Sequence, residues 1–366
     1  MPTVIFYNII LFSSTFFVYL SEKGRRKIDR QFLLGIAFLL VFVPSAIRYD
    51  IGTDYMAYKE IYENPVRLIK YLKEPGFYFI NWFLKSIGAH FQWMFASFAF
   101  IFTAVAFKAY PKKGAWLLHF LFFSMLWFLS FNIMRQTIAL AWCLLALVYF
   151  FDRKYLCFFI LTLIGAIFHQ SALFITAIGL MALIPLSFNF KTRIAPIIFI
   201  SIIIVTFVSM NIVLVYIEQI LKFAGFTVYA SYFSNVKHFI ARDFGSGIGV
   251  LAKVLFSVYI ILNTKELLQF NKNYWLLICL TCVYTVGVVL ANSIIIFGRM
   301  ANTFIVAPVF GAFILYQLKR NKNIHRLVLA VFMIFLLLSF IKDGMGIETS
   351  YANPKRNPYQ TIFTEL

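Results

Sequence analysis

Residues 48–58 hold the densest group of chemically useful side chains in this chain, in the order Arg-Tyr-Asp-Ile-Gly-Thr-Asp-Tyr-Met-Ala-Tyr. They directly follow an apolar run and bring together a guanidinium, two carboxylates and three phenols. Gly52 permits a sharp turn, and Asp54 is expected to cap a following amphipathic helix. The buried face of that helix would consist of Tyr55, Tyr58, Ile61 and Tyr62. The stretch is either a membrane-exit loop with a helix cap or part of a binding site, and the positions of the other polar residues decide between these interpretations.

Two further arginines stand at the boundaries of apolar runs, as Arg48 does. Arg135 lies in Asn132-Ile-Met-Arg-Gln, where Asn132 is an expected N-cap. The guanidinium would then stand in the first helical turn, beside backbone amides and the positive end of the helix dipole. Arg299 begins another apolar run. One arginine at a helix end means little, because it can snorkel. Three such arginines, each beside other polar residues and each with a fork that suits phosphate oxygens, predict an anion site.

His169 is the expected proton acceptor of this group. It separates two apolar runs, and Ser171 is expected to cap the second. An imidazole titrates near neutral pH and adjacent arginines would hold it neutral. Asp50 and Asp54 are the other candidates for catalysis, although arginine or a helix cap would engage them more readily. A lone histidine in a membrane protein more often fixes a helix junction, and Asp50 becomes the leading base if His169 does only that.

A metal ion at this site is a second possibility. Asp50 and Asp54 could hold a divalent cation, because carboxylate and diphosphate oxygens together form a hard-ligand site. The three arginines already supply positive charge, so we expect a site with no metal and no cofactor. The four cysteines, which all fall within apolar runs, are Cys143, Cys157, Cys279 and Cys282. Cys279-x-x-Cys282 has no second pair, and we expect small buried hydrophobic residues there.

The composition indicates the elements that must position these side chains. The 366 residues are 62% hydrophobic and only 13% charged, with a mean hydropathy of +0.85. This predicts an all-α polytopic integral membrane protein. The first run has no basic residues ahead of it and no cleavage-site pattern, so we expect a transmembrane helix and not a signal peptide. Apolar runs near the required length of about 20 residues occur at 3–20, 31–47, 91–109, 114–131, 133–151, 155–169, 170–186, 194–216, 248–263, 273–296, 299–318 and 327–341. We therefore expect about 12 transmembrane helices.

Basic residues predict the orientation of these helices. Six short loops, which alternate along the chain with the outward segments, hold 17 of the 33 lysines and arginines but only four of the 14 acids, and this places all six in the cytoplasm. Both termini and the long segments 48–90, 217–247 and 342–366 would then lie outside. Segment 75–88 is too short and polar to cross and is expected to be re-entrant or interfacial. The net charge of +19 is explained by orientation and by anionic headgroups, so no nucleic-acid partner is expected.

The expected organisation is a single transmembrane domain over residues 1–345, with outward loops at 48–90 and 217–247. Residues 346–366 would form an external C-terminal tail. Because Arg48, Arg135, Arg299 and His169 all fall on the outer side, the topology predicts an outward-facing polar cavity. This cavity would recognise an anion and offer carboxylate and imidazole for proton transfer.

Four motifs are similar to those of the EpsG family. They are Arg48-x-Asp-x-Gly-Thr-Asp-Tyr-x-x-Tyr58, Glu74-Pro-Gly-Phe77, Asn132-x-x-Arg-Gln-x-x-Ala139 and His169-x-Ser-Ala-Leu173. The resemblance extends over roughly residues 1–345, and Arg299 and the Asn357-Pro-Tyr359 tail are weaker markers. The family comprises membrane proteins associated with exopolysaccharide polymerisation and is grouped with Wzy-type O-antigen and capsule polymerases.

The resemblance implies a fold like that of polytopic (GT-C-like) glycosyltransferases with lipid-linked donors. It implies an oligosaccharide repeat unit on a polyprenyl diphosphate as both donor and acceptor. The site residues that the matching motifs contribute are Arg48, Asp50, Gly52, Thr53, Asp54, Tyr55, Arg135, Gln136 and His169, with Thr53, Tyr55 and Gln136 as substrate contacts. The location would be the bacterial plasma (inner) membrane, with the active site facing the periplasm or exterior. The bilayer, a chain-length regulator and a flippase are the further candidate partners.

Two other functions share part of this pattern. A glycan ligase or other membrane transferase would use the same outward cavity and differ only in its acceptor. A flippase for lipid-linked oligosaccharides would also need arginines in a cavity, but it should carry ionisable residues near mid-membrane and internal repeats. Apart from Lys253, the expected helix interiors are almost free of charge, and no repeat is visible. The polymerase interpretation is therefore preferred over the ligase, and both over the flippase.

Overall fold

The structure is a computed structural model that describes residues 2–223, 248–291, 295–346 and 355–363. These residues form helices joined by short turns, with one isolated β-bridge between Arg48 and Thr361. Contacts within the chain divide it into two compact units, residues 1–176 with 333–366 (unit 1) and residues 177–332 (unit 2). The sequence predicted one domain over residues 1–345 and a tail, and it did not predict a division into two units. The C-terminal residues belong to unit 1.

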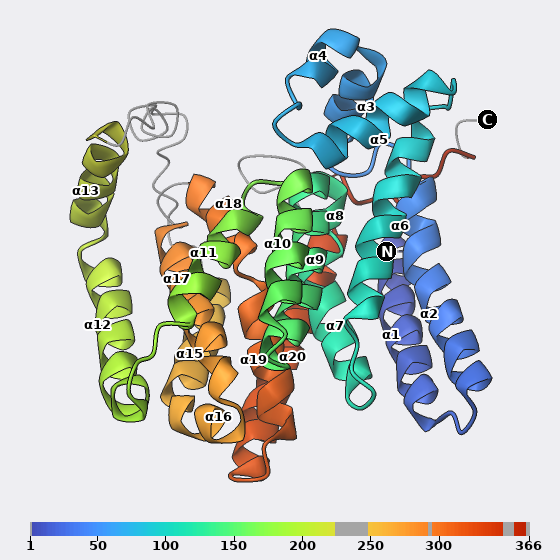
Figure 1. The fold of residues 1–366 in the computed structure, drawn as a ribbon. Helices are drawn as coiled ribbons and strands as arrows, with labels where there is room; N and C mark the ends of the chain where they lie inside the picture. The colour runs from blue at the N-terminus through green and yellow to red at the C-terminus, as the bar shows by residue number, and fades with distance from the viewer. Residues whose placement is uncertain (1, 224–247, 292–294, 347–354, 364–366) are drawn as a thin grey trace. The chain divides into compact units, whose positions relative to one another are not determined.

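Unit 1 is built around α9 (Met134–Phe151), which packs against α6 (Gln92–Lys108) and α10 (Tyr155–Phe168). Most residues of α9 are buried, as expected of a helix that is apolar on all sides. The antiparallel helices α1 (Pro2–Lys23) and α2 (Lys27–Ile47) lie side by side (Figure 1). The other helices of unit 1 are α7 (Ala115–Leu126), α8 (Leu129–Asn132), the first part of α11 (Ala172–Ala182) and the last part of α20 (Lys322–Gly344).

Three short helices lie together at one end of unit 1 (Figure 1): α3 (Tyr55–Glu63), α4 (Pro65–Ile69) and α5 (Pro75–Ser86). The predicted amphipathic helix is confirmed, because the buried residues of α3 are Tyr55, Tyr58, Ile61 and Tyr62. Proline at the first position of α4 and of α5 favours these helix starts, where its missing N–H costs nothing. With 12 residues, α5 is too short to cross a membrane.

Unit 2 is organised around α17 (Trp275–Leu290), which packs against α12 (Ala195–Val208), α15 (Ile248–Leu262) and α19 (Val306–Gln317). Its remaining helices are α13 (Met210–Phe223), α16 (Thr264–Phe270), α18 (Ile295–Thr303), the one-turn elements η1 (Phe190–Ile194) and η2 (Lys272–Tyr274), and the first part of α20. Most of the predicted outward segment 217–247 lies outside the described residues.

The described helices identify a multi-pass membrane protein. Six are long and apolar enough to cross a membrane, or up to eight if the two bent pairs each count as one span. Four more apolar helices, α6, α7, α10 and α11, are shorter. At about 1.5 Å per residue, the 11 residues of α11 extend over about half of a hydrocarbon core of about 30 Å. Each predicted apolar run coincides with helix in the described residues, but the count of 12 crossings is not confirmed.

Segments that were expected on one side of the membrane meet at one end of unit 1. The Thr3 hydroxyl accepts a hydrogen bond from the Tyr359 amide (3.0 Å), and Tyr49 N donates to Gln360 O (3.0 Å). The other end of α1 contacts a different part of the unit, since the Glu22 carboxylate accepts hydrogen bonds from the amides of Gly114 (3.0 Å) and Trp116 (2.9 Å) at the start of α7. The N-terminal residues, the 48–54 loop and residues 355–362 therefore share an end. That this end faces outward stays a prediction.

Candidate functional site

Glu74, Arg135 and His169 form a cluster in unit 1. Arg135 Nη1 pairs with Glu74 Oε2, and His169 Nδ1 lies 3.3 Å from Glu74 Oε1. The Glu74 side chain is only 8% exposed, whereas those of Arg135 and His169 are 24% and 31% exposed. The buried Glu74 carboxylate thus contacts both the Arg135 guanidinium and the His169 imidazole, and these two side chains are partly exposed at the surface.

Local sequence explains how each member is positioned. Glu74 is the N-cap residue of α5, and its side chain makes no cap hydrogen bond, so the carboxylate turns toward Arg135. Arg135 is the second residue of α9, so it stands in the first helical turn, as predicted. His169 ends α10 in an extended conformation. Gly76 lets α5 approach α10 closely, because a Cβ there would lie 3.2 Å from the Ile167 carbonyl oxygen.

Aromatic side chains surround the Arg135 guanidinium. Its Cζ lies 4.6 Å from the centre of the Tyr71 ring and 5.4 Å from that of Phe77. It also hydrogen-bonds Tyr58, and this bond and the attraction to Arg135 oppose the effect of burial, which raises the pKa of the Tyr58 hydroxyl. Burial likewise raises the pKa of the Glu74 carboxyl, against the opposing effect of Arg135. The rings position the cation and lower the local dielectric constant around the pair.

Arg48 is placed differently from the expected phosphate ligand. It is 1% exposed, and its guanidinium donates to the carbonyl oxygens of Ser45 (2.7 Å), Ile51 (3.3 Å) and Phe131 (3.5 Å). The rings of Phe95 and Phe131 lie against it, with centres 4.9 and 4.8 Å from Cζ. These contacts tie the end of α2 to α8, so Arg48 serves as an anchor in this structure.

A small cavity beside Arg48 is lined in part by Ser45, Ser130 and Thr137. It has room for about one water molecule, far less than a sugar requires. This space is therefore not the expected substrate cavity.

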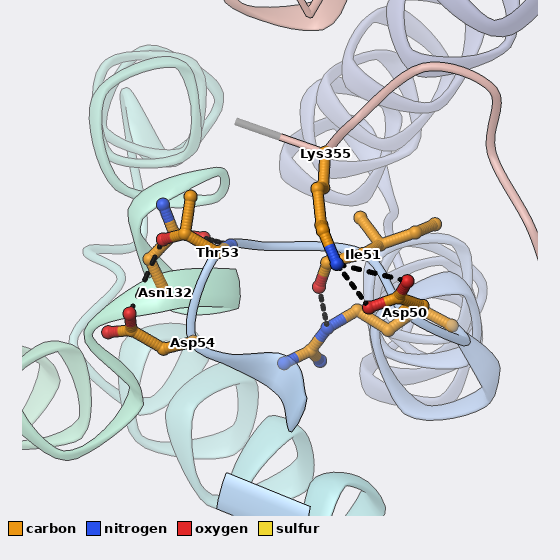
Figure 2. Close-up of polar contacts among 7 residues, drawn as sticks. Asp50, Ile51, Thr53, Asp54, Asn132 and Lys355 are labelled. Carbon is orange, nitrogen blue, oxygen red and sulfur yellow. Dashed lines mark hydrogen bonds and ion pairs between the residues drawn. The ribbon is translucent and has the colours of Figure 1, made fainter. Parts of the chain in front are cut away.

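The turn at Gly52 presses the 48–54 loop against the junction of α8 and α9. Gly52 has φ +99°, and a Cβ there would lie 2.5 Å from the Phe131 carbonyl oxygen. Thr53 N donates to Asn132 Oδ1 at 3.1 Å (Figure 2). The prediction that Asn132 caps α9 is wrong, because α9 begins at Met134 after Ile133 and the Asn132 amide is bound to the loop.

The two aspartates of the loop lie on opposite sides of the turn (Figure 2). Asp50 pairs with Lys355, at 3.0 and 3.1 Å from its two carboxylate oxygens. Asp54 occupies the N-cap position of α3, but its side chain makes no cap hydrogen bond and instead accepts from Thr53 Oγ1 (3.4 Å). The predicted position of the cap is confirmed and the predicted cap bond is wrong. Within the described ranges, no three or more His, Cys, Asp or Glu side chains come together as a metal site.

Three other expected residues have varied surroundings. Tyr55 is buried, stacks on Phe95 with ring centres 4.2 Å apart, and donates to Gln92 Oε1 (2.9 Å). Gln136 is also buried, near the start of α9. Arg299 lies on α18 in unit 2.

The turn between α10 and α11 lacks its predicted side-chain cap. Ser171 was expected to cap α11, but its buried hydroxyl has no hydrogen-bond partner in the described part of the chain. A backbone bond from Ala172 N to His169 O (3.2 Å) closes the turn instead.

The cysteines agree in part with their expected role. All four are free thiols. Cys143 and Cys282 are buried, as predicted for small hydrophobic residues, and Cys157 and Cys279 are partly exposed.

Glu74 is the member of the cluster to which the sequence assigned no role. In the sequence analysis, Glu74 was used only as part of the Glu-Pro-Gly-Phe motif that resembles the EpsG family. One signal was available, since it is one of only 14 acids in the chain and directly precedes a proline that starts a helix. Its two partners lie 61 and 95 residues further along the chain, and no local pattern names them.

The fold and this cluster define a multi-pass helical membrane protein with a partly exposed Arg–Glu–His site. Such a site combines a fork for an anionic group with an imidazole that can move a proton. The chain matches the model of the EpsG family over residues 31–361. It therefore belongs to the EpsG family, which is associated with exopolysaccharide polymerisation and membrane glycosyltransferase activity. No curated protein and no solved structure matched the chain.

Proposed function

We propose that this protein is a polymerase of a bacterial surface polysaccharide: O-antigen, capsule or exopolysaccharide. It would join oligosaccharide repeat units carried on polyprenyl diphosphate, at the outer face of the plasma membrane. The observation that carries the proposal is the Glu74 carboxylate, buried between the partly exposed Arg135 and His169. A chain-length regulator and a flippase would act with the polymerase.

Arg135 would bind the diphosphate of the donor. A guanidinium has five N–H donors, and the pair with Glu74 uses Nη1. Nε is buried and has no hydrogen-bond partner in the described residues, so the ligand would be held by the exposed part of the guanidinium, and Nε would gain a partner only if the side chain shifts. The amides of the first turn of α9 and the helix dipole add to the attraction for an anion. These donors would stabilise the negative charge that grows on the leaving diphosphate.

His169 would act as the general base. Glu74 Oε1 lies 3.3 Å from Nδ1, so the proposed active tautomer would carry its proton on Nδ1 and use Nε2 as the base. Glu74 is the weaker candidate for the base, because it is nearly buried and both of its oxygens face partners. Glu74 would therefore orient the imidazole and stabilise it once it is protonated.

The reaction follows from these roles. A hydroxyl of the incoming lipid-linked unit attacks the anomeric carbon at the reducing end of the growing chain. Its proton passes to His169 Nε2 as the new glycosidic bond forms. The bond between the anomeric carbon and the diphosphate oxygen breaks, and polyprenyl diphosphate departs with the electron pair. The growing chain is thereby transferred to the incoming unit.

The other candidate residues have supporting parts in this proposal. Arg299 and Thr53 stay candidate substrate contacts, and Asp50 is the alternative base. Tyr55 and Gln136 are buried and would shape the site through packing. Arg48 would hold the 48–54 loop against α8.

Gel analysis of surface glycan in a strain that lacks the gene tests the function. A polymerase defect leaves single repeat units, a ligase defect leaves uncapped lipid core, and a flippase defect leaves lipid-linked units in the cytoplasm. Complementation by Arg135→Ala should fail at normal expression. The matched control is Arg67→Ala, from an exposed ion pair with Glu60 in the same segment of the chain. Full-length polymer from Arg135→Ala would refute the assigned role.

A further inference from the structure

Residues 355–362, here called the strap, lie along the backbone of the 48–54 loop. The strap and loop are distant in sequence but are joined by an antiparallel bridge between Arg48 and Thr361. Two backbone hydrogen bonds connect them, from Gly52 N to Lys355 O (3.1 Å) and from Tyr49 N to Gln360 O (3.0 Å), and a third joins the strap to the end of α2, from Ile362 N to Ile47 O (3.0 Å). Two loop amides and the last carbonyl of α2 thus depend on the strap for their partners.

Side chains fasten the strap at several points. Lys355 pairs with Asp50 across the loop (Figure 2). The Tyr359 hydroxyl donates to the Pro44 carbonyl oxygen in α2 (2.8 Å). The Tyr7 hydroxyl of α1 donates to the Arg356 carbonyl oxygen (2.9 Å), and the Arg356 guanidinium lies over the ring of Phe128, 4.9 Å from its centre. The strap is therefore packed into unit 1 and binds elements on both sides of the loop.

The loop backbone has two residues with positive φ, one of which is not a glycine. Asp50 has φ +45° and Gly52 has φ +99°, and the first of these is unusual for a residue with a side chain. On the bundle side, the loop is held by Arg48 and by the bond from Thr53 N to Asn132. The strap supplies contacts to the loop backbone on its other side. The loop is therefore held between the helix bundle and the strap.

The loop in turn connects directly to the candidate site. It leads into α3, whose Tyr58 hydrogen-bonds Arg135. It also holds Asn132, three residues before Arg135, at the junction where α9 begins. A shift of the loop would therefore move Arg135 relative to Glu74 through two contacts, one by way of Tyr58 and the other by way of Asn132.

We infer that the strap is a built-in part of the site, and that Lys355 and Tyr359 are positioning residues that keep Arg135 aligned with Glu74 and His169. This inference rests on the proposed function for its catalytic consequence. Its structural half stands separately, because the strap protects two loop amides whether or not the protein polymerises sugars.

Hydrogen exchange of the purified full-length protein tests the structural half. The Lys355→Asp and Tyr359→Phe variants should exchange faster at Tyr49 and Gly52, by about fivefold for the loss of one supporting contact. Exchange at residues 132–137 should also rise, which reports on the site independently of activity. The Lys355→Asp, Asp50→Lys double variant restores the ion pair with reversed charges and should return exchange toward wild type.

Polymer assembly by the same variants tests the catalytic half. A chain ended after residue 354 should lose activity, while a chain ended after Phe363 keeps the strap and should retain it. The point variants cover the case in which the shorter chain fails to insert. Unchanged exchange in Lys355→Asp and Tyr359→Phe would overturn the inference. Faster exchange with wild-type polymer assembly would overturn the positioning role. If the wild-type protein makes no polymer, the proposed function fails, and exchange at residues 132–137 alone decides whether the strap aligns the site.

Discussion

Replacing Glu74 by glutamine removes the charge that joins Arg135 to His169 while keeping the size of the side chain. The amide would still fill the space before α5, but it offers one acceptor oxygen where the carboxylate offers two. Arg135 would lose its counter-charge and the imidazole would lose the group that fixes its tautomer. Each loss acts on a different step of the proposed reaction: one on binding of the leaving group, the other on proton transfer.

The expected magnitude follows from burial. Breaking a fully buried ion pair costs about 3–5 kcal/mol. Arg135 and His169 are 24% and 31% exposed, and solvent screening reduces this to about 1–2 kcal/mol of stability. The effect on turnover should be larger. General base catalysis contributes about 10²–10⁴, and an imidazole that is present but unoriented should lose about 100-fold.

The dependence of the rate on pH distinguishes orientation from a purely structural role. A carboxylate beside an imidazole favours the protonated ring. The imidazole of the glutamine variant should therefore stay neutral and active to a lower pH. The acid limb of its rate profile then shifts to lower pH, while the maximal rate on the plateau decreases. Burial raises the pKa of Glu74 above that of an exposed carboxyl. The variant has no carboxyl at this position, so its acid limb would report the imidazole alone.

The assay is polymer assembly from purified lipid-linked repeat units by protein reconstituted in liposomes, followed across pH. Glu60→Gln is the matched control, because Glu60 forms an ion pair with Arg67 in which both side chains are more than half exposed. Exposed pairs contribute about 0–1 kcal/mol, so this variant should keep nearly full activity. A Glu74→Gln protein with the wild-type rate and an unmoved acid limb would refute the role of Glu74.

Four further predictions address the same site. Arg135→Lys keeps the charge but loses the fork, and turnover should fall by roughly tenfold or more with normal insertion; an unimpaired rate would contradict diphosphate binding. His169→Gln can hydrogen-bond but cannot act as a base, so reconstituted activity should be nearly lost, and a wild-type rate would make His169 structural. EDTA should leave activity intact; a loss that magnesium or manganese restores would show a metal site at the loop aspartates. In intact cells, with any outer membrane permeabilised, an impermeant thiol reagent should label Lys59→Cys in the outward segment 48–90, whereas Lys112→Cys, in one of the six loops expected in the cytoplasm, should react only after lysis. The reverse pattern would invert the topology.

Local structure was predictable wherever a single periodic pattern determined it. The face of α3 followed from apolar residues spaced three and four apart, and burial of Tyr55 and Tyr58 confirms that face. Arg135 falls in the first turn of α9 because the apolar run begins there. Apolar runs located the helices but did not fix the number of crossings. Runs such as 194–216 divide into two shorter helices, α12 and α13, at Ser209.

Side-chain partners were less predictable, because each polar group had several possible partners. Asn132 has the residue type and position of an N-cap, but the loop amide of Thr53 competes for the same oxygen and binds it. Asp50 was expected near an arginine and pairs with Lys355, 305 residues away in sequence. A single sequence carries no information that would select such distant partners.

The contrast between Arg48 and Arg135 shows what decides whether a rare charge is available to a ligand. Both arginines lie at helix ends in a chain with few charges, and both forks suit oxygen acceptors. The acceptors around Arg48 are backbone carbonyls, which carry no net charge and which the fold itself supplies. The acceptor beside Arg135 is a carboxylate shared with an imidazole, and it leaves part of the guanidinium exposed. An arginine held by carbonyls completes the fold, whereas one paired with a shared carboxylate can exchange contacts with an anion and transmit the effect to a base. For this reason the proposed chemistry rests on Arg135, Glu74 and His169, with Arg48 as their support.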